Sequence, residues 1–189
     1  MKQKEEIANE WNPSLGVTAF STLGEELSSM EPFKLEPSEV PLIIRLTENP
    51  KYDLGIFPGS VSLHNHDCIH IILGRGVLVK DEAFVIGFTM GSTKRIGFFR
   101  ESLFCALTKH LYPEGYKFTN QDLTVYKAGL SIASNMNCKD LSKMDFKKYE
   151  NWTLPKIRKK IGVDSKTLRY YYYLERQMFP DCTESQRLL

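Results

Sequence analysis

Two histidines and two carboxylates fall within seventeen consecutive residues, at a spacing that suits a metal ion: His66, Asp67, His70 and Glu82. Each residue of a helix advances by about 100°. His66 and His70 therefore lie one above the other, and Asp67, three residues before His70, is expected on the same flank. The glycines in 74–76 end such a helix, so Glu82 must come from a second helix that folds back.

The donor atoms in this group are imidazole nitrogens and carboxylate oxygens, without a thiolate. This set suits zinc, iron(II) or manganese, and magnesium could also occupy it. We expect one divalent metal ion, with zinc favoured. The neighbouring residues 69–73 are mostly apolar and predict a buried helix, in which unpaired imidazoles and carboxylates are costly. His64 is predicted to point to the other side of the helix, as a neighbour rather than a ligand.

The composition is that of an ordinary globular protein. The chain has 189 residues, of which 42% are hydrophobic and 25% charged, and its formal net charge is +2. This length can bury one good core. The small net charge argues against nucleic acid as a general partner, so any basic patch must be local.

The compartment is predicted from the cysteines and from the apolar runs. The four cysteines are widely spaced and form no Cys-x-x-Cys pair, which favours buried thiols in a reducing compartment; they are Cys68, Cys105, Cys138 and Cys182. The first residues have charge but no apolar run behind them, so no signal peptide is expected. No stretch approaches eighteen apolar residues, so no transmembrane helix is expected either. We predict a cytoplasmic or peripherally membrane-associated protein.

The hydrophobic pattern predicts an all-α fold, a single helical domain of about six helices. Ser60 or Ser62 is expected to cap the helix that carries the histidines to about Leu73. Thr119, with Asp122 three residues later, is expected to cap another. The remaining expected helices span 42–46, 79–90, 98–111, 152–161 and 165–179.

Three segments are expected along the chain. Residues 1–41 contain Pro13, Pro32, Pro37 and Pro41 and predict a loosely ordered N-terminal segment. Residues 42–163 form the helical metal-binding domain. Residues 164–189 are an added C-terminal helical extension.

The motif His66-Asp67-x-x-His70, followed after eleven residues by Glu82, resembles the signature of the coenzyme Q biosynthesis protein 4 family. A second, weaker match is the segment 152–163, which is similar to the C-terminal pattern of that family: a tryptophan, a leucine and an Arg-containing turn that ends in an apolar-Gly-apolar stop. The resemblance covers about residues 42–163. The Pro-rich start and the helix after Val163 depart from the family, as in a divergent member.

The resemblance implies an all-helical protein of ubiquinone (quinone) biosynthesis that binds one divalent ion through His66, Asp67, His70 and Glu82. It also implies a bound prenyl lipid or quinone precursor, and partners among the other biosynthetic enzymes. The family has been linked to oxidative decarboxylation of a prenylated ring, which an ion with open coordination positions could support. A homodimer is also possible. The aromatic residues that could line a prenyl groove, or simply fill the core, are Phe84, Phe88, Phe98, Phe99 and Phe104.

An alternative is a DNA-binding regulator with a helix-turn-helix at 154–173. The segment 157–171 resembles the regulators of mercury resistance, where a glycine turn precedes a helix with a Thr-Leu-Arg-Tyr-Tyr core. It offers bases and aromatic rings together. Against it stand the near-neutral charge of the chain and the absence of a following wing. Otherwise the tyrosines at 170–173 would pack on the main domain or on a second subunit.

A third possibility is a metal phosphohydrolase of the HD superfamily, which also begins with a His-Asp pair on a helix. Such enzymes need a further histidine upstream and an aspartate downstream. The sequence has no histidine before His64, although His110 and Asp122 lie downstream. No residue is marked out as a catalytic base.

Overall fold

The computed structural model describes residues 11–16, 18–33 and 57–189. These residues form eight α-helices and three short 3-10 helices, and apart from an isolated bridge between Thr22 and Thr153 they contain no β structure. The predicted all-α single domain is confirmed. The expected helix at 42–46 lies outside the described residues.

The α-helices are α2 (Leu23–Met30), α4 (Leu63–Leu73), α5 (Val79–Ser92), α6 (Phe98–His110), α7 (Asn120–Asn135), α8 (Leu154–Ile161), α9 (Ser165–Met178) and α10 (Thr183–Gln186). The expected ends that fall on described helices differ from these by one or two residues at most. Two of the expected caps are present. The Ser62 hydroxyl accepts from the Asn65 amide, and Thr119 forms a reciprocal capping box with Asp122.

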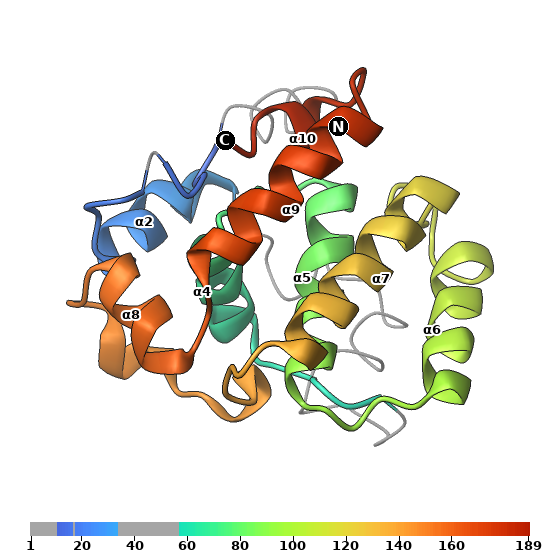
Figure 1. Ribbon diagram of the computed structural model, residues 1–189, viewed down its shortest axis with the longest axis horizontal. Coiled ribbons are helices and arrows are strands. Elements are labelled where there is room, and N and C mark those ends of the chain that lie inside the picture. Colours follow the sequence, from blue (N-terminus) through green and yellow to red (C-terminus); the bar gives the residue numbers. More distant parts are fainter. Residues whose placement is uncertain (1–10, 17, 34–56) are drawn as a thin grey trace.

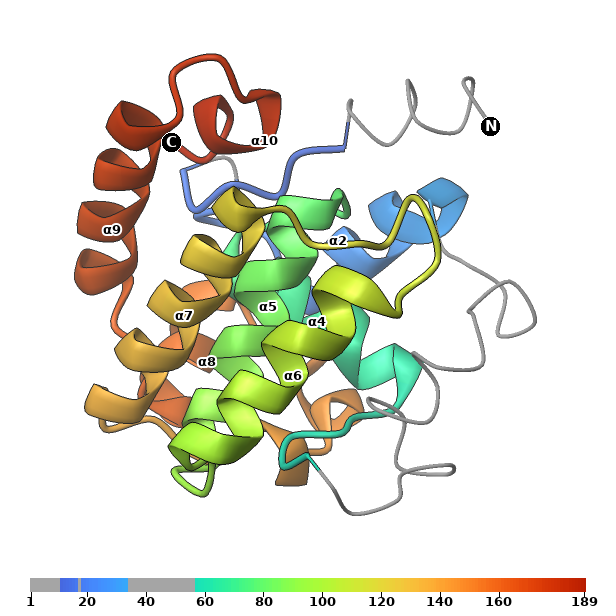
Figure 2. The same ribbon diagram turned by 90° about the vertical axis from the view of Figure 1, so that its right-hand side faces the viewer.

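Helix α5 lies at the centre of the molecule, between α4 and α7, with α9 along the outside (Figures 1 and 2). It is buried on nearly every side. Its Phe84 and Phe88 belong to the main core, with side chains from α2, α4, α8 and α9. Its Ile86 and Met90 belong to a second cluster, with Phe104 of α6 and Tyr126 of α7. A helix that is apolar all round is expected in such a central place.

Glycines allow α5 and α7 to approach each other closely. A Cβ atom added to Gly87 would lie 2.1 Å from the Tyr126 carbonyl oxygen, and one added to Gly129 would lie 2.6 Å from the Phe84 carbonyl oxygen. No real side chain tolerates such distances. The backbones of the two helices therefore touch where the glycines face each other, and this contact fixes the position of α5.

The N-terminal part contributes more to the core than the proline pattern predicts. Helix α2 begins at a capping box in which Thr22 and Glu25 satisfy each other's backbone amides. It buries Leu23, Leu27 and Met30 in the main core. The Leu23 amide also donates to the Trp152 carbonyl at 3.0 Å, which ties α2 to the start of α8. The prolines flank this helix rather than prevent it.

The C-terminal elements form the predicted pair of helices. Gly162, with φ of 79°, ends α8, and the Asp164 carboxylate caps α9 by accepting from the amides of Lys166 and Thr167. Tyr171 and Tyr172 are buried, whereas Tyr170 and Tyr173 are exposed. The tyrosine run therefore packs on the main domain through its two central members.

All helices in the described ranges are short. The longest, α7, has 16 residues, and none of those described combines the length and the apolar character needed to cross a membrane.

The close approach of α5 and α7 leaves no space for a side chain at Gly87. Gly87→Ala should destabilise the fold by about 2–3 kcal/mol, because a methyl group must push apart two helix backbones. Chemical denaturation measures the loss. Gly16→Ala is the matched control, since a Cβ there meets nothing within 4 Å. Equal stability of the two variants would contradict the packing described here.

Candidate metal centre

His66 lies in the first half of α4, which is partly buried, and His70 lies in the second half, which is buried. His66 is 20% exposed, and the side chain of His70 is fully buried. The helix ends at Gly74, whose φ of 72° only glycine adopts without strain. The chain then turns through 75–78 into α5, and Glu82 is in the first turn of that helix. The predicted second helix thus brings Glu82 back to the histidines.

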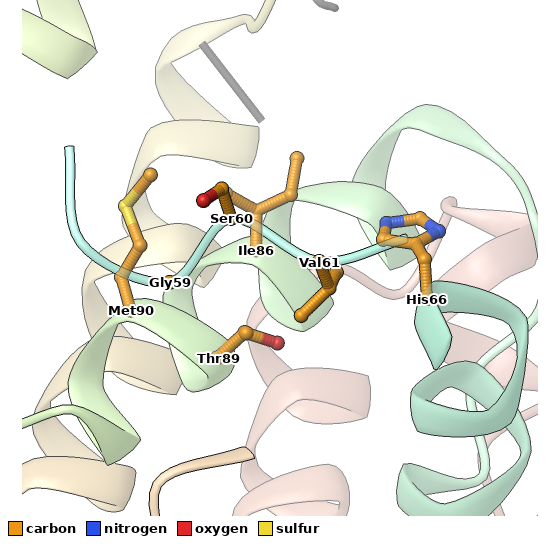
Figure 3. Close-up of a pocket in the computed structure, with 7 residues that line it drawn as sticks. All are labelled: Gly59, Ser60, Val61, His66, Ile86, Thr89 and Met90. Atoms are coloured by element: carbon orange, nitrogen blue, oxygen red, sulfur yellow. The ribbon is translucent and has the colours of Figure 1, made fainter. Parts of the chain in front are cut away.

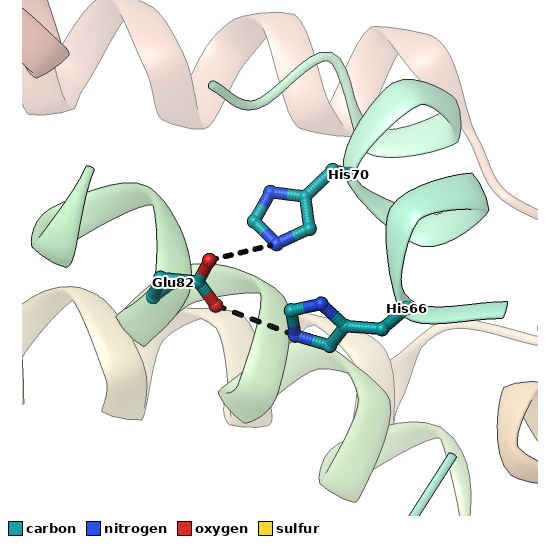
Figure 4. Close-up of side chains that lie close together, drawn as sticks. All are labelled: His66, His70 and Glu82. Carbon is teal, nitrogen blue, oxygen red and sulfur yellow. Dashed lines mark ion pairs between the residues drawn. The ribbon is translucent and has the colours of Figure 1, made fainter. Parts of the chain in front are cut away.

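The three side chains converge on one point (Figure 4). His66 Nε2 lies 3.3 Å from Glu82 Oε2, and His70 Nε2 lies 3.3 Å from Glu82 Oε1. One ligand atom from each of the three residues lies within 4.8 Å of the other two. Nitrogen and oxygen ligands at about 2.1 Å from a tetrahedral ion stand roughly 3.4 Å apart. The two distances from imidazole nitrogen to carboxylate oxygen are close to this value, although they end on different oxygens of Glu82. The three side chains therefore surround a space in which one ion could lie.

The proton on His70 is placed by the loop after α4. Its Nδ1 lies 2.6 Å from the carbonyl oxygen of Gly76. A carbonyl only accepts, so Nδ1 carries the hydrogen, and in the neutral ring Nε2 then holds a bare lone pair. This Nε2 is buried and has no hydrogen-bond partner. A ring nitrogen that faces a carboxylate oxygen at 3.3 Å needs a cation between the two atoms, either a proton on Nε2, which gives an ion pair with Glu82, or a metal ion. Backbone carbonyls orient metal-binding histidines in this way.

The charge of Glu82 depends on its two histidine neighbours. Burial alone would raise the pKa of its carboxyl group, but positive charge on His70 and His66 outweighs burial and holds the pKa below its usual range. Glu82 is therefore an anion at neutral pH. The ionised carboxylate is 31% exposed and lies beside a fully buried imidazole, so the site is open to solvent on the Glu82 side.

Asp67, the fourth predicted ligand, is not part of this group. It is partly buried on α4, and helix geometry turns it about 100° from His66 and about 60° from His70, which is about 80° from their mean direction. His64 lies 3.5 Å from Glu150, outside the group, as expected of a neighbour. The structure thus brings together His66, His70 and Glu82 and leaves Asp67 beside them.

Two side chains from the C-terminal half satisfy the last carbonyl groups of α4. Arg158 donates through Nε to the Ile72 carbonyl at 2.7 Å, and the Tyr172 hydroxyl donates to the Leu73 carbonyl at 2.6 Å. Carbonyls at a helix end need such partners when they are buried. Arg158 is the arginine in the weaker match at 152–163. Its place here is structural, since it anchors the end of the helix that carries both histidines.

A buried network of charges holds the loop between α4 and α5. The Arg75 guanidinium makes a two-pronged contact with Glu175 of α9, at 2.9 Å and 2.5 Å, and lies over the Phe84 ring at 4.0 Å. Asp81, next to Glu82 in sequence, accepts from Arg187 at 2.5 Å. The Ser185 hydroxyl donates to Glu175 at 3.1 Å. The C-terminal residues thus fix both ends of the loop that orients His70 and Glu82.

The pKa values of two carboxyl groups in this network are shifted in opposite directions. For Glu175, burial raises the pKa, but the charge of Arg75 and the hydrogen bonds from Arg75 and Ser185 bring it below the usual value. For Asp81, burial outweighs the positive charges of Arg187 and Arg75, and its pKa is raised. Glu175 is therefore the firm anionic partner of Arg75. Its removal would leave a guanidinium buried with only Asp81 nearby, at 3.8 Å.

A small pocket lies beside the cluster, on the His66 side (Figure 3). Its volume is about 20 Å³, which is room for roughly one water molecule. The residues that line it are Gly59, Ser60, Val61, His66, Ile86, Thr89 and Met90. The Thr89 hydroxyl donates to the Val85 carbonyl, so the pocket offers mostly apolar surface. The pocket therefore has room for about one water molecule beside His66.

The aromatic residues considered for a prenyl groove do not lie together. Phe84 and Phe88 are fully buried on α5, where Phe84 stacks on Tyr171 at 5.3 Å. Phe98 and Phe99 begin α6 and are 85% and 77% exposed. Phe104 is buried between α6 and α7 against Tyr126. The first two are core residues, and the second two are surface residues on another helix.

The residues on which the alternative functions depend lie away from the cluster. His110 is exposed at the end of α6. Asp122 caps α7 and lies 3.8 Å from Lys80. Neither joins the group of ligands, so the additional residues of an HD phosphohydrolase are not assembled with it. In the helix-turn-helix segment, Lys159, Lys160 and Arg169 are exposed, but Arg158 is buried under α4.

Comparisons with protein-family models, with curated proteins and with solved structures found no match to this chain. The sequence signal for His66, His70 and Glu82 was their spacing. No such signal pointed to Gly76, Arg75, Asp81, Glu175 or Arg187, although two glycines around an arginine, Gly74-Arg75-Gly76, mark a constrained turn.

The stability of the fold is expected to depend on the buried pair between Arg75 and Glu175. Glu175→Gln should destabilise the fold by about 3–5 kcal/mol at neutral pH, because it leaves the Arg75 charge without its main partner. The depressed pKa of Glu175 means that its contribution is present above the pKa of the unfolded carboxyl, near 4.3, and is lost as the pH falls further. The difference between wild type and variant should therefore shrink in acid. Denaturation curves at several pH values measure this.

The control for Glu175→Gln is Asp145→Asn, which removes one partner of an exposed pair with Lys148. This variant should lose at most about 1 kcal/mol. If Glu175→Gln cost no more than Asp145→Asn, Arg75 would not depend on Glu175 as described.

Proposed function

We propose that this protein binds one divalent metal ion through His66, His70 and Glu82. The observation that carries the proposal is the convergence of one ligand atom from each of these side chains, with the buried His70 ring turned so that Nε2 faces Glu82 while Nδ1–H is held by the Gly76 carbonyl. A metal ion at the centre of the three side chains would take the place that a proton fills when His70 Nε2 and Glu82 form their ion pair. Two nitrogens and one oxygen favour zinc, with iron(II) or manganese as alternatives.

The chemistry proposed for this site is that of an ion with open coordination positions. Two histidines and one carboxylate leave room for water, dioxygen or an oxygen atom of a substrate, and such an ion can polarise a carboxylate or activate a small ligand. The pocket of about 20 Å³ beside His66 supports a small second ligand. We place Asp67 at the edge of this site, where it can accept hydrogen bonds rather than bind the ion.

For the substrate, we propose a prenyl lipid or quinone precursor. Support comes from the resemblance of the His-Asp-x-x-His…Glu motif to the coenzyme Q biosynthesis protein 4 family, together with the helical fold in which three of its residues meet. The proposed role is in modification of a prenylated ring, through the ion. DNA binding by the segment 154–173 is the alternative, supported by the glycine turn and the exposed Lys159, Lys160 and Arg169.

Metal content tests the site. Protein purified without a chelator and reloaded with zinc should hold about one ion per chain by elemental mass spectrometry. His70→Ala should lose it, because both the ligand and its oriented ring are removed. Asp67→Asn should keep it, since Asp67 lies outside the group. Reloading with cobalt(II) should give the intense visible absorption of a tetrahedral site.

The matched control for His70→Ala is His110→Ala, which removes an exposed histidine of α6 and should leave the metal content unchanged. A folded wild-type protein that takes up no zinc, cobalt or iron would contradict the metal site. Loss of metal in Asp67→Asn to the same extent as in His70→Ala would place Asp67 among the ligands.

The substrate is tested separately on native protein. Organic extraction followed by mass spectrometry should recover a prenylated lipid from wild type. If the protein carries metal but no prenyl lipid, the metal site stands and the substrate class falls. If duplex DNA binds instead, with an affinity that drops steeply with salt and depends on Lys159, Lys160 and Arg169, the alternative is supported.

A further inference from the structure

Helix α9 exposes a row of large apolar side chains on its outer face. We call Tyr170, Tyr173, Leu174 and Met178 the α9 stripe; their exposed fractions are 67%, 54%, 39% and 48%. Their spacing places them within about 140° of the helix circumference. The opposite face of α9 is buried through Leu168, Tyr171, Tyr172 and Glu175. The helix is therefore packed on one side and bears an apolar stripe on the other.

An exposed apolar row of this kind marks an interaction surface. Single exposed apolar residues are common, but a contiguous group on one rigid helix is not. The core face of α9 is anchored by the Tyr172 hydroxyl at the Leu73 carbonyl and by Glu175 at Arg75, so the helix has little freedom to turn its outer side chains inward. It lies along the outside of the molecule (Figure 2).

The charges around the stripe differ in sign at its two ends. Exposed Lys166 and Arg169 outnumber the exposed Asp164 at the N-terminal end of α9, which gives that end a net charge of +1. At the C-terminal end, Asp181 and Glu184 outnumber Arg176, which gives a net charge of −1. A surface with cations at one end and an anion at the other complements a copy of itself turned by 180°. A uniformly anionic partner, whether a nucleic acid or a lipid surface, would match only one end.

We propose that the protein forms a homodimer in which the α9 stripes of two copies pack antiparallel, about a two-fold axis between Tyr173 and Leu174. Tyr173 of one protomer then lies against Leu174 of its partner, and Tyr170 lies against the exposed Gln177 and its neighbour Met178. The Lys166 end of each helix faces the Asp181 end of the other. Such an interface is self-complementary, as a two-fold axis requires. Antiparallel helices also bring the positive end of each helix dipole to the negative end of the other.

The first test measures the oligomeric state of the full chain by sedimentation velocity. The protein concentration is varied from about 1 to about 100 µM, a range that includes micromolar dissociation constants. Wild type should sediment as a dimer at the higher concentrations. Tyr173→Glu should raise the dissociation constant by at least about 100-fold, because it places two like charges at the axis and removes a central aromatic side chain. Phe98→Glu is the matched control, since Phe98 is an exposed aromatic residue on α6, and it should leave the dimer intact.

The second test uses surface charges alone, so that folding is not at stake. Lys166→Glu and Asp181→Lys should each raise the dissociation constant by roughly 2- to 30-fold, since each changes two symmetric contacts at the rim. The double variant should restore most of the affinity. A surface that binds an anionic polymer or membrane would instead gain from Asp181→Lys and lose from Lys166→Glu, without any rescue.

Three results would overturn the homodimer. One is a wild type that stays monomeric up to 100 µM. Another is a dimer that forms equally well with Tyr173→Glu, because the interface would then lie elsewhere. The last is a monomeric wild type that binds vesicles of phosphatidylcholine with 30% phosphatidylserine, or duplex DNA, through the α9 stripe. Neither test depends on metal content, so the proposed metal site can fail while the dimer stands.

Discussion

The buried pair between Arg75 and Glu175 is the interaction on which the candidate metal centre most depends. Arg75 follows the glycine that ends α4, and Glu175 lies a hundred residues later on α9. Their contact pulls the loop after α4 into the core, where the Gly76 carbonyl can hold His70. A buried guanidinium is costly unless fully partnered, and here the carboxylate, two aromatic rings and Asp81 surround it. The site therefore draws its geometry from a charge pair that is not among the candidate ligands.

Helix α5 is the other constraint, because it links the site to both parts of the core. Glu82 stands in its first turn, while Phe84, Ile86 and Phe88 anchor the helix on different sides. The glycine contacts with α7 fix its depth. A carboxylate on a helix held in this way has little freedom to retreat from the two imidazoles. The preorganisation of the site is thus a property of packing as much as of charge.

Much of this fold follows from local sequence patterns, since capping residues, glycine stops and helical periodicity act over a few residues. Thr119 with Asp122 and Gly74 after Leu73 placed helix ends correctly. The spacing of His66, His70 and Glu82 likewise predicted their meeting. Asp67 shows the limit of spacing, because an angle of 60° to 100° on a helix decides whether a side chain faces the same point. The residues of the capping box, Thr22 and Glu25, are visible in the sequence, but the prolines on both sides led to the expectation of a loosely ordered segment.

What could not be predicted depends on partners far apart in the chain. Nothing near Arg75 shows that its partner is Glu175, or that Arg187 reaches Asp81. These long-range contacts also form late during synthesis, because Glu175 and Arg187 are near the end of the described residues. Both ligand helices leave the ribosome well before α9 and α10, so the histidines and Glu82 exist for a time without the residues that fix their loop. The three candidate ligands can take their final geometry only when Arg187 has been made, which is long after the ligands themselves.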